Sequence, residues 1–480
     1  MRTVFAEGAV QTQQHHSLPS PAIRIALYGS RITRRDKMDR RTLVKTMAIA
    51  AFSAPMLGTR ALAADLSPLA IAAREAWIFG LPLIENARTR KEVMDAGTKP
   101  NALLHMRILT TPKNQFVVTP NNDTLYSRSW IDLAKGPVRV TLPSTGERYL
   151  SVAFMDMYSN NFAILGTRTT GGDGGTFTVV GPDHATNDPL AIRSPTRWTW
   201  MLVRLLIDGD ADLAAAHALQ DRFRVQGPAA PVPTRRYAER SAPWAEYFQS
   251  VQELMVENSP RATDDRLLDI IAPLGLTARG GFDARRFTPS QVLDVERGVA
   301  AAKAMLATTR RQGPVVDGWV YPKANLGDFG QDYFYRAQVA VAGLAALPRV
   351  EAMYMRPLNP EGRIAFDSSS NWVLDIPADK LPPVNGFWSL SMYKATPDGG
   401  FYFFDNPINR YAIGDRTPAL VRDPTGAISI WISRTDPGPA HRANWLPSPA
   451  DGPFGLVFRA YLPKDALLDG EYHLPRLRPA

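Results

Sequence analysis

Alternating apolar and polar residues mark two stretches of the chain as β structure, and helical spacing marks the stretches before and between them. Short strand-like runs are separated by turns such as Gly171-Gly172-Asp173-Gly174-Gly175. The pattern therefore predicts an α+β multidomain fold with two antiparallel β-sandwich modules of jelly-roll type and helical segments before and between them. The expected parts are a helical segment at 65–112, a first sandwich at 113–207, a helical region at 208–348 and a second sandwich at 349–480.

Several individual elements can also be placed. Ser67 and Pro68 are typical of a helix start, and Gly80 with Pro82 predicts a break that leaves two short helices. Pro289 follows Thr288, and Gln291 lies three residues after Thr288, which is the spacing of a capping box. Further helices are expected at 244–256 and 332–347, and strands at 138–143, 148–158, 161–168 and 175–182.

The first 64 residues resemble a targeting leader. Residues 38–64 contain the paired Arg40 and Arg41, a moderately apolar run, and the small-residue end Ala61-Leu62-Ala63-Ala64. This resembles a twin-arginine signal peptide, with an ordinary secretory signal as the alternative. Residues 1–37 are then disordered or precede the true start at Met38. We expect a periplasmic or secreted protein with no membrane span after signal removal, because the apolar run is too short for a permanent anchor.

The positive charge of the chain is concentrated in this leader. The whole sequence has a formal net charge of +9, but residues 1–64 hold ten Lys or Arg and three acids, so the remainder carries 45 basic and 43 acidic residues. A nearly neutral body gives no electrostatic reason to expect a nucleic-acid partner. The absence of cysteine excludes thiol nucleophiles, iron–sulfur clusters and Cys-ligated zinc.

Several motifs resemble a known pair of domains. "TPNNDTLYSRSWIDL" and "YLSVAFMDMYSNNFAILG" resemble domain of unknown function 1254. "LPPVNGFWSLSMYK", "NRYAIGD", "ISIWIS", "NWLPSP" and "FGLVFRAYLP" resemble its usual companion, domain of unknown function 1214. The resemblance covers nearly everything after the leader and implies helical pieces around two β-sandwiches. It implies little about activity, and many members carry export signals.

Polar and aromatic residues alternate along the expected strand Leu125–Leu133. Tyr126, Arg128 and Trp130 lie on one face together with Asp132. Such a face could stack a planar or sugar-like ligand on Trp130 while Arg128 holds an anionic group. The alternative is an ordinary sandwich surface with an Arg–Asp pair.

Two acidic positions are candidates for proton transfer. Asn121 and Asn122 either close a turn or, with Asp123, form a ligand-binding strand mouth. Asp156 stands in a strand that is apolar on both faces, so it is expected to be buried, on the same face as Tyr158. Its predicted partner is Arg128, and the pair is either part of an active site or structural.

In the second sandwich, Arg410, Tyr411 and Trp445 occupy loop-like positions. Exposed aromatic residues in loops indicate binding, whereas the prolines of "NWLPSP" equally favour a packed loop. The histidines show no metal-ligand spacing, and no hydrolase, zincin or EF-hand motif occurs. No cofactor and no metal are expected, although a metal site built from distant residues stays open.

These residues favour an exported, cofactor-independent hydrolase or lyase acting on a polar, aromatic or saccharide-like small molecule. Asp156 or Asp123 would be the acid/base, Tyr126 or Tyr158 the proton donor, Arg128 the anion clamp and Trp130 the stacking platform. The alternative is a non-catalytic periplasmic ligand-binding or assembly protein. A metalloprotein loaded before export is a third interpretation. Each of them is compatible with a homo-oligomer.

Overall fold

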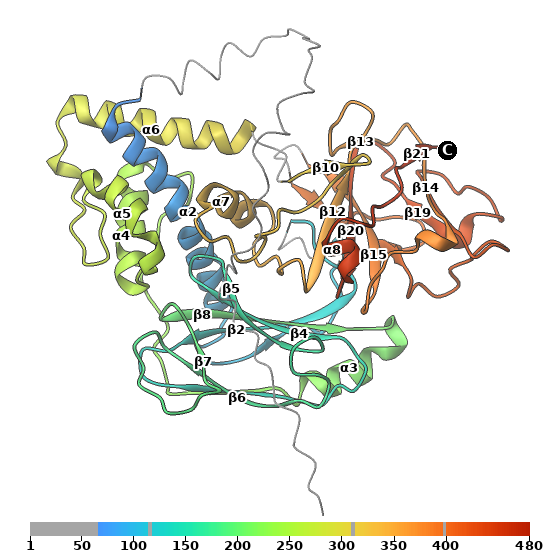
Figure 1. Ribbon diagram of the computed structural model, residues 1–480, viewed down its shortest axis with the longest axis horizontal. Helices are drawn as coiled ribbons and strands as arrows, with labels where there is room; N and C mark the ends of the chain where they lie inside the picture. Colours follow the sequence, from blue (N-terminus) through green and yellow to red (C-terminus); the bar gives the residue numbers. More distant parts are fainter. Residues whose placement is uncertain (1–65, 114–117, 309–312, 397–399) are drawn as a thin grey trace, which may run out of the picture.

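The computed structural model describes residues 66–113, 118–308, 313–396 and 400–480. One sandwich lies below, a second lies at the upper right, and helices fill the upper left (Figure 1). The expected leader, residues 1–37 and 38–64, lies outside the described residues. Over the described ranges no helix is both long and apolar enough to cross a membrane.

Two sheets form the first sandwich. The order of the first sheet is β1-β2-β8-β4-β5, and that of the second is β7-β6-β3-β9. Leu125, Val140 and Phe154 belong to one buried cluster between the two sheets. This explains why apolar side chains recur at alternate positions along their strands. The strands are β1 (Leu104–His105), β2 (Thr124–Asp132), β3 (Val138–Leu142), β4 (Leu150–Asp156), β5 (Asn161–Gly166), β6 (Gly175–Val180), β7 (Ile192–Arg193), β8 (Trp198–Leu206) and β9 (Arg224–Gln226).

The other face of the first sheet packs against helices. Trp130 on β2 and Trp200 on β8 join the helical core, while their strand neighbours point into the sandwich. β9 lies beyond the expected boundary at residue 207 and pairs with β3. The helices are α2 (Pro68–Asp95), α3 (Leu213–Gln220), α4 (Trp244–Glu257), α5 (Asp265–Ile271), α6 (Pro289–Thr308) and α7 (Tyr333–Ala342), with short 3-10 turns at Asp210–Asp212, Ala262–Asp264, Ala272–Leu274 and Ala284–Arg286.

The predicted break in the first helix is wrong, because α2 continues through Gly80 and Pro82 as one 28-residue helix. Most of its surface is buried among the other helices, and this packing overrides the local cost of proline. Gly80 allows close helix contact instead of a break. A Cβ at this position would lie 2.4 Å from Cγ2 of Val251 on α4.

In the second sandwich, an eight-stranded sheet packs face to face with a four-stranded sheet. Their orders are β10-β11-β12-β20-β15-β16, with β13 on β20 and β17 on β15, and β19-β18-β14-β21. The strands are β10 (Val315–Val316), β11 (Trp319–Val320), β12 (Ala352–Pro357), β13 (Phe366–Asp367), β14 (Trp372–Ile376), β15 (Trp388–Ala395), β16 (Phe401–Tyr402), β17 (Ala412–Gly414), β18 (Ile428–Ser433), β19 (Trp445–Pro447), β20 (Pro453–Tyr461) and β21 (Arg478–Pro479). Smaller elements are α8 (Asp465–Leu468), Ala378–Lys380 and Arg442–Asn444.

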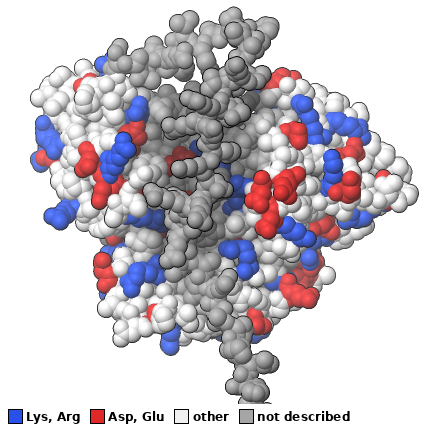
Figure 2. All heavy atoms as spheres, in the orientation of Figure 1, with Lys and Arg blue, Asp and Glu red and all other residues white. Residues whose placement is uncertain are grey.

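The predicted fold class is confirmed: the chain is an α+β protein with two sandwich modules and helices before and between them. The strand pairs β6–β7 and β18–β19 are parallel, so neither module is purely antiparallel. On the face shown in Figure 2, basic and acidic side chains are interspersed, as expected for a nearly neutral body.

A buried carboxylate joins the two sandwiches. Glu351, fully buried just before β12, accepts a hydrogen bond from the Tyr149 hydroxyl at 3.0 Å and pairs with Arg168 Nε at 2.6 Å. Both partners belong to the first module. The rings of Tyr149, Phe387 and Tyr461 pack beside this contact, with 4.2 Å between the last two centroids. The modules therefore meet through specific contacts between buried side chains.

Candidate functional site

A cavity of about 140 Å³ lies where the first sandwich, α7 and the second sandwich meet. Tyr126 and Arg204 line it from β2 and β8, Tyr354 and Arg356 from β12, and Arg459 from β20. Since clefts between modules are common ligand sites, this cavity is the candidate site. Its remaining wall comes from the segment before β2, the C-terminal part of α7 and the loop after β11.

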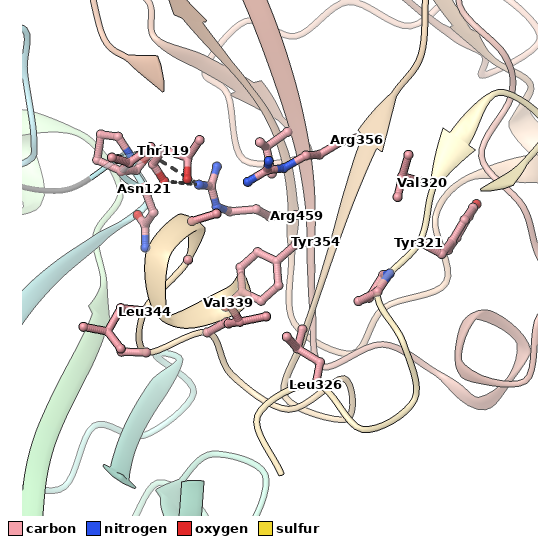
Figure 3. Close-up of a pocket in the computed structure, with 18 of the residues that line it drawn as sticks. Thr119, Asn121, Val320, Tyr321, Leu326, Val339, Leu344, Tyr354, Arg356 and Arg459 are labelled. Carbon is pink, nitrogen blue, oxygen red and sulfur yellow. Dashed lines mark hydrogen bonds between the residues drawn. The ribbon is translucent and has the colours of Figure 1, made fainter. Parts of the chain in front are cut away.

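Two guanidinium groups form one end of the cavity. Arg356 and Arg459 lie next to each other beside Thr119 (Figure 3). Arg459 is buried; its Nη2 donates to the Thr119 carbonyl at 2.8 Å, and its Nη1 donates to Ser391 Oγ at 2.8 Å. The donors of Arg459 are thus largely used by the protein, which fixes the orientation of this positive charge.

Arg356 differs from its neighbour. Among the described residues its guanidinium has no hydrogen-bond or ion-pair partner, and it is half-buried with its head at the cavity. Burial is the main cause of a lowered pKa at Arg356, and the positive charge of Arg459 acts in the same direction. A cation held out of water without an anion is costly, so this arrangement favours an anionic occupant.

A third arginine lines the cavity nearer to α7. Arg204 Nη2 donates to the Ala345 carbonyl at 2.8 Å, and its guanidinium lies 5.5 Å from the Tyr126 ring centroid. Its Nη1 is buried and has no hydrogen-bond partner within the described part of the chain. The described residues that line the cavity include three arginines and no carboxylate.

The end opposite Arg356 is apolar. Leu326, Val339 and Leu344 lie there, and the ring of Tyr354 stands between the two ends (Figure 3). The Tyr354 hydroxyl accepts the Leu347 N–H at 3.3 Å, which holds the ring in place. The cavity therefore has a cationic end at Arg356 and Arg459 and a mainly apolar end, beside which the Arg204 guanidinium is held by the Ala345 carbonyl.

Two carboxylates lie behind the cationic end. Asp123 accepts a hydrogen bond from the Ser389 hydroxyl at 2.8 Å, and burial raises its pKa although the charge of Arg459 opposes the shift. Burial also raises the pKa of Asp415 to about 6, against the opposing effect of the Trp388 N–H. Neither carboxylate lines the cavity.

The opening of β2 places two of the predicted residues at the cavity. Asn121 Oδ1 accepts the N–H groups of Asp123 at 2.6 Å and Thr124 at 3.0 Å, which is an Asx-type turn. Its Nδ2 donates to the Tyr126 hydroxyl at 3.1 Å. Asn121 and Tyr126 line the cavity, whereas Asn122 lies half-buried in the turn and is not part of the wall.

Asp156 is buried as predicted, but its predicted partner is wrong. Its Oδ2 pairs with Arg261 Nη2 at 2.7 Å, not with Arg128, and its Oδ1 accepts the N–H groups of Tyr158 and Asn160, both at 2.9 Å. Tyr158 is buried as well, and its hydroxyl donates to the Asn258 carbonyl at 2.8 Å. Neither Asp156 nor Tyr158 lines the cavity.

Arg128 and Trp130 face the helices, not the cavity. Trp130 is buried and stacked on Trp200 with 5.3 Å between ring centroids. Arg128 is half-buried, and its Nε has no hydrogen-bond partner in the described ranges. Burial lowers the pKa of Arg128, while Glu92 opposes the shift.

The predicted loop residues of the second module are packed. Arg410 Nη1 donates to the carbonyls of Ala443 and Trp445, each at 2.8 Å. Trp445 is buried and donates from Nε1 to the Ser433 carbonyl at 2.9 Å, and Tyr411 is buried against Phe403. These three residues hold the loops together away from the cavity.

The structure also brings together a serine and a histidine. His105 Nδ1 lies 2.7 Å from Ser127 Oγ, which also accepts from Gln220 Nε2 at 3.1 Å. Ser127 is fully buried, so a substrate has no access to it and the pair is structural. Throughout the described segments no three potential His, Asp or Glu ligands gather into a metal site.

Sequence reasoning missed Arg204, Arg356 and Arg459. A usable signal was present, because each is a charged residue within a strand of mainly apolar neighbours, as in "WTWMLVRLL", "AMYMRP" and "FGLVFRAY". The argument that identified Asp156 as buried applies equally to these cations.

One of two solved structures compared with this chain supports the fold. A crystal structure of the VPA0106 protein from Vibrio parahaemolyticus has a TM-score of 0.65 and 24% identity, covering 86% of this chain and 100% of that one. A second, an uncharacterised protein from Burkholderia cenocepacia, has a TM-score of 0.43 and 12% identity, covering 86% and 94%. No curated protein matches this chain.

Two family matches cover the two modules. Residues 100–227 match the family described as Protein of unknown function (DUF1254), and residues 351–465 match Protein of unknown function (DUF1214). The first match extends past residue 207 to include β9, and the second contains β12 and β20. The chain therefore carries both matches in one polypeptide, which confirms the resemblance to this pair of domains.

Proposed function

We propose that this protein binds a small organic anion in the cavity between its two modules. The observation that carries the proposal is Arg356, a half-buried guanidinium without an anionic partner among the described residues. Arg459 and Arg204 add further positive charge to the same wall, and none of the described residues that line it is a carboxylate. An anion would compensate the cost of keeping these cations out of water.

Binding fits this geometry better than hydrolysis or elimination. Of the four residues assigned to catalysis on sequence grounds, Tyr126 alone lines the cavity. A general base must lie within hydrogen-bond reach of the proton that it removes, and the part of the wall that the structure describes offers no carboxylate for this role. The function best supported is therefore that of a ligand-binding protein.

A thermal-shift screen with small anions and neutral molecules of similar size tests the proposal. Anions should raise the melting temperature of the wild type and not that of Arg356→Met, which keeps the side-chain length and removes the charge. Arg363→Met is the matched control, because Arg363 is exposed and outside the cavity wall. Equal shifts in all three proteins would contradict the proposal.

We also propose that the protein is exported to the periplasm or secreted through its twin-arginine leader. The paired Arg40 and Arg41 before a moderately apolar run support this. Replacement of both arginines by lysine should leave the full-length chain in the cytoplasm. Cell fractionation measures this, and normal export of the double variant would rule out the twin-arginine route.

A further inference from the structure

We propose that the ligand is a small monocarboxylate whose apolar body is about the size of one six-membered ring. This rests on the proposed function and assigns the chemistry of the same cavity. In this arrangement the carboxylate binds Arg356 next to Arg459, and the ring lies against Val339 and Leu326 beyond the Tyr354 ring.

The cavity volume indicates the size of the part of the ligand that the protein surrounds. At about 140 Å³ it is close to the roughly 150 Å³ of an engineered apolar cavity that binds benzene. A single ring with a small charged group fills this volume, and a sugar chain or a nucleotide would extend beyond it toward solvent.

The distribution of polarity sets the character of the ligand. An inorganic anion would occupy the cationic end and leave Leu326, Val339 and Leu344 facing water or empty space. A neutral hydrocarbon would fill the apolar end and leave Arg356 unpaired. A molecule with one anionic head and one apolar body satisfies both ends.

The available donors favour a carboxylate over a phosphate. Arg459 already gives its two terminal nitrogens to Ser391 and Thr119, and the remaining Nη1 of Arg204 is fully buried. The donors that remain accessible are mainly those of Arg356. One planar guanidinium matches one planar carboxylate through two parallel N–H···O bonds. A phosphate dianion would need further donors for its third oxygen.

Isothermal titration of the purified full-length protein with benzoate, benzamide and inorganic phosphate tests this assignment. Benzoate should bind, and benzamide and phosphate should bind at least tenfold more weakly. Arg356→Met should lower the affinity for benzoate at least tenfold. Arg356→Lys should also weaken it, because an ammonium group cannot make the planar two-bond contact. Arg363→Met should bind as the wild type does.

A second variant keeps the test independent of Arg356. Val339→Phe places a larger side chain at the apolar end, so it should weaken benzoate while leaving the Arg356 charge in place. Circular dichroism and the melting temperature check that each variant folds.

The outcomes separate the two proposals. If phosphate binds as tightly as benzoate and both lose affinity in Arg356→Met, the cavity binds anions but the carboxylate assignment is overturned. If benzamide binds as tightly as benzoate in every variant, the charge of the ligand does not contribute to binding and the assignment is overturned. If benzoate, phosphate and every anion of the thermal-shift screen fail to bind the wild type, the proposed function itself fails.

Discussion

A buried and a half-buried charged group in this protein, Asp156 and Arg356, have opposite surroundings. Asp156 receives two backbone N–H groups, the Asn160 amide and the Arg261 guanidinium, so its charge is fully matched. Arg356 lies at the edge of a cavity, with no anion near it among the described residues and with a second cation beside it. The first arrangement stabilises a fold, and in the second the described residues supply no anion to the guanidinium.

The difference shows why burial of a charged residue alone does not identify a functional site. Both residues stand within strands that their sequence neighbours make apolar, and sequence reasoning can recognise both as buried charges. What separates them is whether the fold supplies a partner of opposite charge. The candidate site lies at Arg356, for which the described residues supply no such partner.

The largest expected effect concerns the matched charge. Asp156→Asn should lower the free energy of unfolding by about 2–4 kcal/mol, because Arg261 loses its counter-ion and the turn after β4 loses its anionic acceptor. Urea unfolding followed by tryptophan fluorescence measures this. The exposed Asp173→Asn should change stability by less than about 0.5 kcal/mol. A similar small change at Asp156 would show that its network is dispensable.

The unmatched charge should respond in the opposite direction. Arg356→Met should raise the unfolding free energy of the ligand-free protein by about 1–2 kcal/mol, because it removes an uncompensated, half-buried charge and keeps the side-chain volume. The same urea titration, run without added anions, measures it. Destabilisation by Arg356→Met would mean that the guanidinium contributes to the fold, and the contrast with Asp156 would disappear.

The smallest expected effect concerns pH. The folded pKa of Asp415 is raised from 3.8 to about 6 by burial, so its favourable contribution is complete below pH 3.8 and is lost as pH rises through about 6. Asp415→Asn resembles the protonated form and should gain at most about 1 kcal/mol relative to the wild type between pH 4 and 7.5, because Asp415 is only half-buried. Parallel melting curves across this range measure the gain. The exposed Asp405→Asn should show no such trend.

Much of the fold was predictable because its signals are local. The alternation that predicts strands at 138–143 and 175–182 corresponds to β3 and β6, and the capping-box start corresponds to α6. The break predicted at Pro82 failed because the dense packing around α2 outweighs the local cost of proline. Such contacts between residues distant in the sequence cannot be recognised from the local sequence pattern.

The site was less predictable because its parts are distant in the sequence. Arg261 follows Asp156 by 105 residues, and Tyr126 and Arg459 meet only when the two modules pack together. Asn121 and Tyr126 were identified from one polar strand and do line the cavity. Their cationic neighbours Arg204, Arg356 and Arg459 stand singly in apolar strands, where the local pattern does not show which charges meet in the folded protein.

The cavity wall is shared between the modules, and this has a practical consequence. Neither sandwich alone contains both Tyr126 and Arg356, so a fragment carrying one module would lack the complete recognition surface. If the chain were expressed as two complementary polypeptides, the bound molecule would bridge them and favour their reassembly. The architecture thus offers a scaffold for a split sensor, in which reconstitution of the halves reports the presence of a metabolite.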